Sequence, residues 1–101
     1  MATGTAFPTT LQHGVKTVAT AGTAEQITST ATPIKWVSIQ AQTDNTGMVA
    51  VGISGVLATV ATGNGILLSA GQVYTVPIDD LSDIYIDTTV NGDGVRYLYG
   101  I

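Results

Sequence analysis

Two stretches of the chain decide the fold, WVSIQAQTDNTGMVAVG at residues 36–52 and LLSAGQVYTVPIDDLSDIYID at residues 67–87. In both of them hydrophobic and polar residues alternate, which is the period of a β-strand with one buried face. The alternating runs are separated by Asn45-Thr46-Gly47, Ala70-Gly71 and Asp79-Asp80, residue types that favour turns. The pattern predicts a β-hairpin followed by two more strands.

The same period continues on both sides of these stretches. The expected strands span residues 15–19, 25–28, 34–41, 48–53, 66–69, 72–78, 84–88 and 95–101. In the fourth strand we expect Val49, Val51 and Ile53 to face inward, and Asn91-Gly92-Asp93-Gly94 predicts a hairpin turn between the last two strands. Residues 54–65 fit either an edge strand or an irregular loop. We predict an all-β fold, a single antiparallel β-sandwich, jelly-roll-like, with seven or eight short strands.

The first residues show no such period. We expect residues 1–12 (MATGTAFPTTLQ) to form a flexible N-terminal arm ahead of a β-sandwich domain over residues 13–101. The arm is either a frayed end or a segment that lies on a neighbouring subunit, with Phe7 and Leu11 as anchors. A basic region followed by an apolar segment is not visible, nor is an apolar run of about 20 residues. We therefore expect a soluble protein, made in a cytoplasm and without a membrane partner.

Charged residues are scarce, which excludes several classes of function. Asp, Glu, Lys and Arg make up 10% of the chain, against about 25% in a typical soluble domain. The net charge is −4, and the three cations, Lys16, Lys35 and Arg96, are far apart in the sequence. Because phosphate binding needs clustered Lys and Arg, we expect no nucleic-acid partner. With no cysteine in the chain, disulfides and thiolate metal sites are excluded.

Catalytic residues are not grouped in a recognisable pattern. His13 is the only histidine and follows the irregular N-terminal segment, so a Ser-His-Asp triad is not supported. Gly52-Ile53-Ser54-Gly55 lacks the spacing and the following helix of a nucleophile elbow. Glu25 is the only glutamate, which argues against paired-carboxylate chemistry. We expect no enzyme, no catalytic residue and no cofactor.

Five aspartates, Asp79, Asp80, Asp83, Asp87 and Asp93, lie close together in the sequence. They could bind calcium, since hard cations take several oxygen ligands, but their spacing does not match an EF-hand loop. The favoured interpretation is that Asp79 and Asp80 form a turn, while Asp83 and Asp87 protect the strand between them from edge pairing. We predict no metal site and leave calcium binding at residues 79–93 open.

Several hydrophobic residues are candidates for contact with a partner. Trp36 lies on the Ser38 side of its strand, where it either caps the core or is an exposed anchor. The last strand is apolar on both faces, and such a strand is often covered by another subunit. The candidate interface residues are Phe7, Leu11, Trp36, Tyr97, Leu98 and Tyr99.

Several blocks of sequence together resemble a known group of proteins. They are Thr23-Ala24-Glu25-Gln26-Ile27, residues 36–41, Asn45-Thr46-Gly47, Val51-Gly52, Leu68-Ser69-Ala70-Gly71 and residues 79–86. In this order the chain resembles small structural proteins of tailed bacteriophages, over roughly residues 15 to 101. The group includes capsid decoration (cement) proteins and also tail components. The matching positions are turn glycines and strand residues, and the resemblance implies no catalytic residues.

The resemblance implies a virion structural protein. It implies a homotrimer that binds the major capsid protein on the outer surface of the head and stabilises the capsid by bridging its subunits. A tail, baseplate or fibre subunit is the first alternative. A carbohydrate-binding β-sandwich for adhesion to host surfaces is the second alternative, because Trp36 and the tyrosines could stack on sugar rings.

Overall fold

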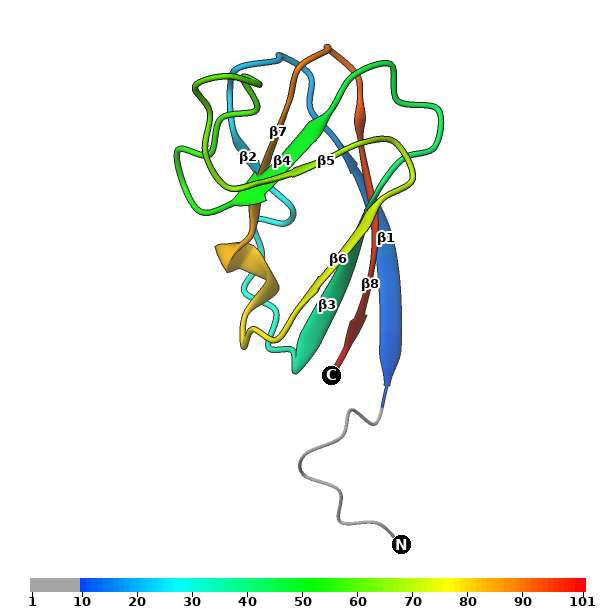
Figure 1. Cartoon of the computed structure of the whole chain (residues 1–101). Helices are drawn as coiled ribbons and strands as arrows, with labels where there is room; N and C mark the ends of the chain where they lie inside the picture. Colours follow the sequence, from blue (N-terminus) through cyan, green and yellow to red (C-terminus); the bar gives the residue numbers. More distant parts are fainter. Residues whose placement is uncertain (1–9) are drawn as a thin grey trace, which may run out of the picture.

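Eight strands form two four-stranded antiparallel sheets (Figure 1). The structure is a computed structural model that describes residues 10–101, so Phe7 lies outside the described residues. The strands are β1 (Leu11–Thr17), β2 (Glu25–Gln26), β3 (Trp36–Ala41), β4 (Val49–Gly52), β5 (Ile66–Leu68), β6 (Val73–Val76), β7 (Tyr85–Thr88) and β8 (Gly94–Gly100). A single 3₁₀ turn, η1 (Leu81–Asp83), is the only helical element in this part of the chain. The all-β prediction is confirmed.

The strand order is that of a jelly roll. One sheet has the order β1-β8-β3-β6 and the other has the order β2-β7-β4-β5. The pairs β1–β8, β2–β7, β3–β6 and β4–β5 are those of one long hairpin rolled into a two-layered barrel. The central pairs β3–β8 and β4–β7 then join these strand pairs into the two four-stranded sheets. The sandwich prediction is therefore confirmed in its topology as well.

The core lies between the two sheets because each contributes its apolar face. The first sheet contributes Val37, Ile39, Ala41 and Val95, and the second contributes Val49, Val51, Leu68 and Ile86. These positions follow the alternation of the sequence, and β3 is buried at every second residue. Ile53, expected to face inward, lies beyond the end of β4 and is exposed.

The outer face of the β2-β7-β4-β5 sheet carries a second, smaller core. Residues 53–65 form no strand, and they fold back so that Val56 and Ala58 pack on Ala50 of β4. All three side chains are buried. The segment with two open interpretations is thus an irregular loop, and it covers this face of the sandwich.

Two of the predicted hairpins do not form. Asn45-Thr46-Gly47 connects β3 to β4, but these strands belong to different sheets. Asn91-Gly92-Asp93-Gly94 likewise leads from β7 in one sheet to β8 in the other. Both hairpin predictions are wrong because the two loops bond to each other: the Asp93 carboxylate accepts from the Gly47 N–H at 2.8 Å, and Asn45 Oδ1 accepts from the Gly94 N–H at 3.0 Å.

The N-terminal boundary also differs from the prediction. β1 begins at Leu11, so Leu11 and Gln12 belong to the sheet and not to the expected arm. Both residues pair with β8, at Gly100 and Tyr99, and this pairing holds them in the strand. The local sequence could not predict it, because the partner strand lies at the other end of the chain. Within residues 10–101, no helix has the length and hydropathy needed to cross a bilayer.

Candidate functional site

The outer face of the β1-β8-β3-β6 sheet is not covered by any loop among the described residues, and we call it the bare face. Its side chains are Leu11, His13, Val15, Thr17, Trp36, Ser38, Gln40, Val73, Thr75, Arg96 and Leu98. Four of them are large apolar side chains that are 39% to 60% exposed: Leu11, Val15, Val73 and Leu98. Several large apolar side chains exposed on one sheet face mark interaction sites more often than single exposed residues do.

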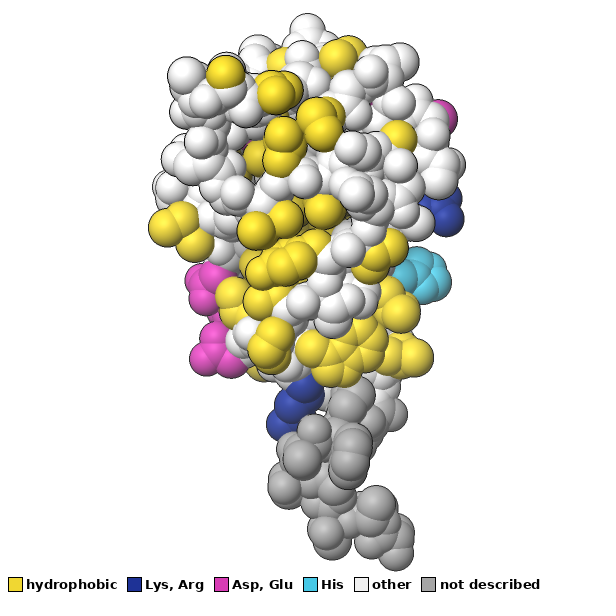
Figure 2. All heavy atoms as spheres, in the orientation of Figure 1, with side chains coloured by type: hydrophobic (Ala, Val, Ile, Leu, Met, Phe, Trp, Pro, Cys, Tyr) yellow, Lys and Arg dark blue, Asp and Glu magenta, His cyan; other side chains and the backbone are white. Residues whose placement is uncertain are grey.

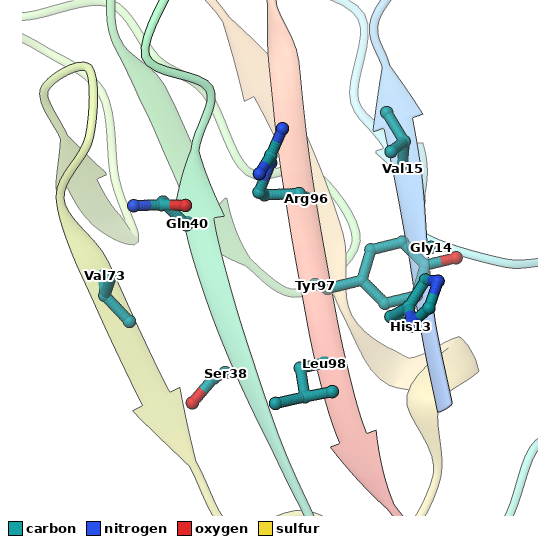
Figure 3. A pocket seen from close by; sticks show the side chains of 9 residues that line it. All are labelled: His13, Gly14, Val15, Ser38, Gln40, Val73, Arg96, Tyr97 and Leu98. Atoms are coloured by element: carbon teal, nitrogen blue, oxygen red, sulfur yellow. The ribbon is translucent and has the colours of Figure 1, made fainter. Parts of the chain in front are cut away.

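A shallow hollow of about 490 Å³ lies in the middle of the bare face (Figure 3). Figure 3 shows that Leu98 and Arg96 of β8 form its centre, with His13 and Val15 of β1 on one side and Val73 of β6 on the other. Ser38 and Gln40 of β3 also line it, so four neighbouring strands build the hollow. The hollow is open and apolar, with polar groups at its rim.

The bare face carries positive charge and no carboxylate. Arg96 makes no ion pair within residues 10–101, whereas Lys16 is bound to Glu25 of β2 at 2.9 Å. The Lys16 ammonium, with a hydrogen bond from the Ala19 N–H, lowers the pKa of the Glu25 carboxyl. On the rim, the Gln40 amide donates to the Gly71 carbonyl, and the hydroxyls of Ser38 and Thr75 bond to each other. Arg96 is left available for an acidic partner group.

The predicted interface residues fall into two groups. Leu11 and Leu98 are exposed on the bare face, and Trp36 is half-buried at its end. Tyr97 and Tyr99 lie on the inner face, stacked at 6.0 Å between ring centroids and packed against the core. Burial raises the pKa of the Tyr97 hydroxyl. Both tyrosines therefore contribute to the core, and Tyr97 also lines the hollow of Figure 3.

A second hollow of about 830 Å³ lies where the edge strands β5 and β6 diverge. It is lined by apolar side chains from both sheets, including Ile66 of β5 with Tyr74 and Val76 of β6. Figure 2 shows the apolar side chains gathered across this side of the molecule. Asp83 and Ser54 supply polar groups at its ends. We call it the edge groove.

Three of the aspartates, Asp80, Asp87 and Asp93, hold loops together through hydrogen bonds from backbone N–H groups. Asp87 is 1% exposed, and its two oxygens accept from the N–H groups of Gly22 and Ala58 at 2.9 and 2.8 Å. Asp80 accepts from the N–H groups of Thr32 and Ser82, which lowers the pKa of its carboxyl.

The prediction that Asp83 and Asp87 protect an edge is wrong, because the strand between them, β7, is an inner strand. Asp87 is also buried under residues 53–65. Within the described part of the chain, no three His, Asp or Glu side chains are grouped as metal ligands. The oxygens of Asp87 are already engaged by backbone donors, which leaves them poorly suited to bind calcium.

His13 lies on the bare face, where its neighbours across β8 and β3 are Leu98 and Ser38. The Ser38 hydroxyl bonds to Thr75, and no carboxylate orients the imidazole on this face. The arrangement suits binding better than nucleophilic catalysis. Sequence reasoning missed Val15, Val73 and Arg96 as surface residues, although their alternation with inward-facing neighbours carries the signal.

Comparisons with known protein families, with characterised proteins and with solved structures find no match for this chain. The chemistry of the bare face is therefore the main guide to what the molecule does.

Proposed function

We propose that this protein is a structural component of a bacteriophage virion, a capsid decoration protein that adheres to the outer surface of the head. The bare face is the observation that carries the proposal. It displays Leu11, Val15, Val73 and Leu98 on a rigid sheet, with Arg96 as its free charge among the described residues. The resemblance to small phage structural proteins and the jelly-roll topology support the same role.

The mechanism is adhesion. Apolar surface removed from water contributes about 25 cal/mol per Å², and a specific interface buries about 800 Å² on each partner. A four-stranded sheet orders the backbone of the bare face before binding, so docking costs no backbone ordering there. Arg96 would bind a carboxylate of the major capsid protein. Contacts that span two capsid subunits oppose their separation and so stabilise the head.

The test uses virions from which the protein has been stripped. Adding back the wild-type chain should restore its copies on the head and raise the temperature at which the capsid opens. Leu98→Asp should bind at least tenfold more weakly, because a charge replaces the centre of the hollow. Val60→Asp is the matched control, since Val60 is an exposed apolar residue outside the bare face. Unchanged capsid stability, or equal binding by both variants, would refute the proposal.

A tail, baseplate or fibre subunit would use the same adhesive chemistry at another place in the virion. The copy number per particle separates the two assignments. Hundreds of copies per particle indicate the head, whereas a few dozen or fewer indicate the tail.

Carbohydrate binding is the second candidate, and the hollow of Figure 3 is the feature that favours it. Its lining offers the Gln40 amide and the Arg96 guanidinium beside the aliphatic side chain of Leu98. The half-buried Trp36 is the aromatic residue of this face. Glycan binding that is lost in Gln40→Ala and Trp36→Ala would support this function, and a negative glycan screen would exclude it.

A further inference from the structure

The four edge strands of the sandwich are unequal. β2 has two residues, β5 has three and β6 has four. Pro77, which has no N–H group to donate, directly follows β6. β1 has seven residues and lies at the margin of its sheet (Figure 1). Short strands and prolines are the usual protection against edge pairing, and β1 alone among these edges has neither.

The backbone groups that β1 leaves free can be derived from its pairing with β8. The N–H of Ile101 donates to the carbonyl of Thr10, and the N–H of Val18 donates to the carbonyl of Asp93. Both contacts belong to the same antiparallel register, in which even-numbered residues of β1 form the hydrogen-bonded pairs. The odd-numbered residues therefore point their N–H and carbonyl groups away from β8.

Four residues make up this free edge: Leu11, His13, Val15 and Thr17. Their backbone N–H and carbonyl groups have no protein partner within residues 10–101. Their side chains are exposed on the bare face. The edge thus offers an uninterrupted ladder of hydrogen-bonding groups, with Leu11 and Val15 exposed along one side. Proteins add a strand from another chain at edges of this kind.

We propose that β1 pairs with β1 of a second copy, antiparallel and about a two-fold axis at Gly14. In this register Leu11 of one copy faces Thr17 of the other and His13 faces Val15, so that all four residues of each edge form hydrogen-bonded pairs. Any other symmetric register leaves at least one of the four unpaired. The two sheets join into one of eight strands, with both bare faces on the same side.

The residues of β1 suit this pairing. Gly14 meets Gly14 at the axis as a non-hydrogen-bonded pair, in which the two Cα atoms approach to about 4.5 Å. Lys16, the only charged residue of the strand, faces Gln12 of the second copy and not the other Lys16. The interface is isologous and therefore closed. It uses the edge and leaves the bare face free, so that this proposal and the capsid proposal can fail separately.

Molecular mass in solution tests the proposal directly. Sedimentation equilibrium from about 1 μM to 1 mM should show the 10.3 kDa chain converting to twice that mass. Val15→Lys should weaken the association at least tenfold, because it adds a charge to the edge. Val15→Pro removes one N–H group that points away from β8 and leaves the hydrogen bonds between β1 and β8 intact. It should also weaken the association at least tenfold.

Val73→Lys is the matched control. Val73 is 57% exposed against 60% for Val15, and it lies on the same face at the opposite margin. The Val73→Lys variant should dimerise as strongly as the wild-type chain. Circular dichroism shows whether each variant is folded. A monomer at all concentrations, a trimer, or a dimer that both Val15 variants leave intact would overturn the proposal.

A cross-linking experiment tests the register. The chain has no cysteine, so His13→Cys and Val15→Cys introduce the only thiols. The facing positions 13 and 15 should have Cα atoms about 5.5 Å apart, within disulfide range. Identical positions lie on the diagonal, at about 7–8 Å.

Oxidation of an equimolar mixture of the two variants should yield a covalent dimer that neither variant forms efficiently alone. Absence of the cross-link in the mixture, or equal cross-linking of each variant by itself, would contradict this register.

Discussion

The two sheets of the sandwich differ in what lies on their outer faces. The β2-β7-β4-β5 sheet is covered by residues 53–65, which bury Ala50 under Val56 and Ala58. The β1-β8-β3-β6 sheet has no such cover among the described residues and exposes Leu98 and its apolar neighbours. Both sheets have apolar residues on their outer sides. Among the described residues, the chain thus covers one outer face by itself and leaves the other exposed to solvent.

The covered face depends on Asp87, and its removal should have the largest effect. Asp87→Ala deprives the N–H groups of Gly22 and Ala58 of their acceptor in a buried place. We expect a loss of about 3 kcal/mol in the free energy of unfolding, which lowers Tm by about 15 °C. Thermal denaturation measures it. Asp44→Ala, at an exposed carboxylate, should change the stability by less than about 0.5 kcal/mol.

The margin of the bare face depends on Gly14, where a smaller effect is expected. A Cβ atom at this position would overlap the ring and hydroxyl of Tyr97, which packs across Gly14 from β8. Gly14→Ala should therefore cost about 1–2 kcal/mol in the free energy of unfolding. In a Tyr97→Leu background the same substitution should cost less than half as much. Equal costs in both backgrounds would show that the two residues are not coupled.

Acid should lower the free energy of unfolding by less than the Asp87 and Gly14 substitutions do. Hydrogen bonds lower the pKa of Asp80 and of Glu25 in the folded state. The unfolded chain binds protons more readily than the folded one. The two carboxylates therefore contribute fully to the free energy of unfolding above their ordinary pKa of about 4, and this contribution is lost as the pH falls through their lowered folded-state pKa values. Denaturation between about pH 5 and pH 3 should show this decline. Asp80→Asn should make the loss of stability with falling pH shallower. An unchanged slope would contradict a role for the Asp80 carboxylate in this loss.

Substitutions on the bare face should have the smallest effect on stability. Val15→Lys and Val73→Lys both place a charge where water already reaches, so each should change the free energy of unfolding by less than about 0.5 kcal/mol. Chemical denaturation of the monomer at low concentration measures this. A loss above about 2 kcal/mol in either variant would mean that the bare face contributes to folding, and the contrast between the two sheets would no longer hold.

The positions of the strands were predictable because a strand is a local pattern. β3, β4, β7 and β8 lie within two residues of their expected bounds, since alternation with a period of two can be read in any short window. Turn chemistry was predictable for the same reason. Asn45-Thr46-Gly47 and Asn91-Gly92-Asp93-Gly94 do reverse the chain, but each passes it to the other sheet.

The candidate site was predictable only in part. Leu11 and Leu98 were expected at a surface, and both are exposed there. The inward placement of Tyr97 and Tyr99 follows from the alternation of β8 with Leu98, but which side of that strand meets the second sheet is not a local property. The role of Asp87 could not be predicted, because its hydrogen-bond donors are 65 and 29 residues away.

The sequence by itself determined that the chain forms short strands, which residues share each face of a strand, and how few charges are available for chemistry. These properties depend on neighbouring residues and on composition alone. Only the tertiary structure decided which strands pair, which face residues 53–65 cover, and that no strand within residues 10–101 pairs with the outer edge of β1. Those outcomes rest on hydrogen bonds and packing between segments far apart in the chain, such as Asp87 with Gly22 and β1 with β8.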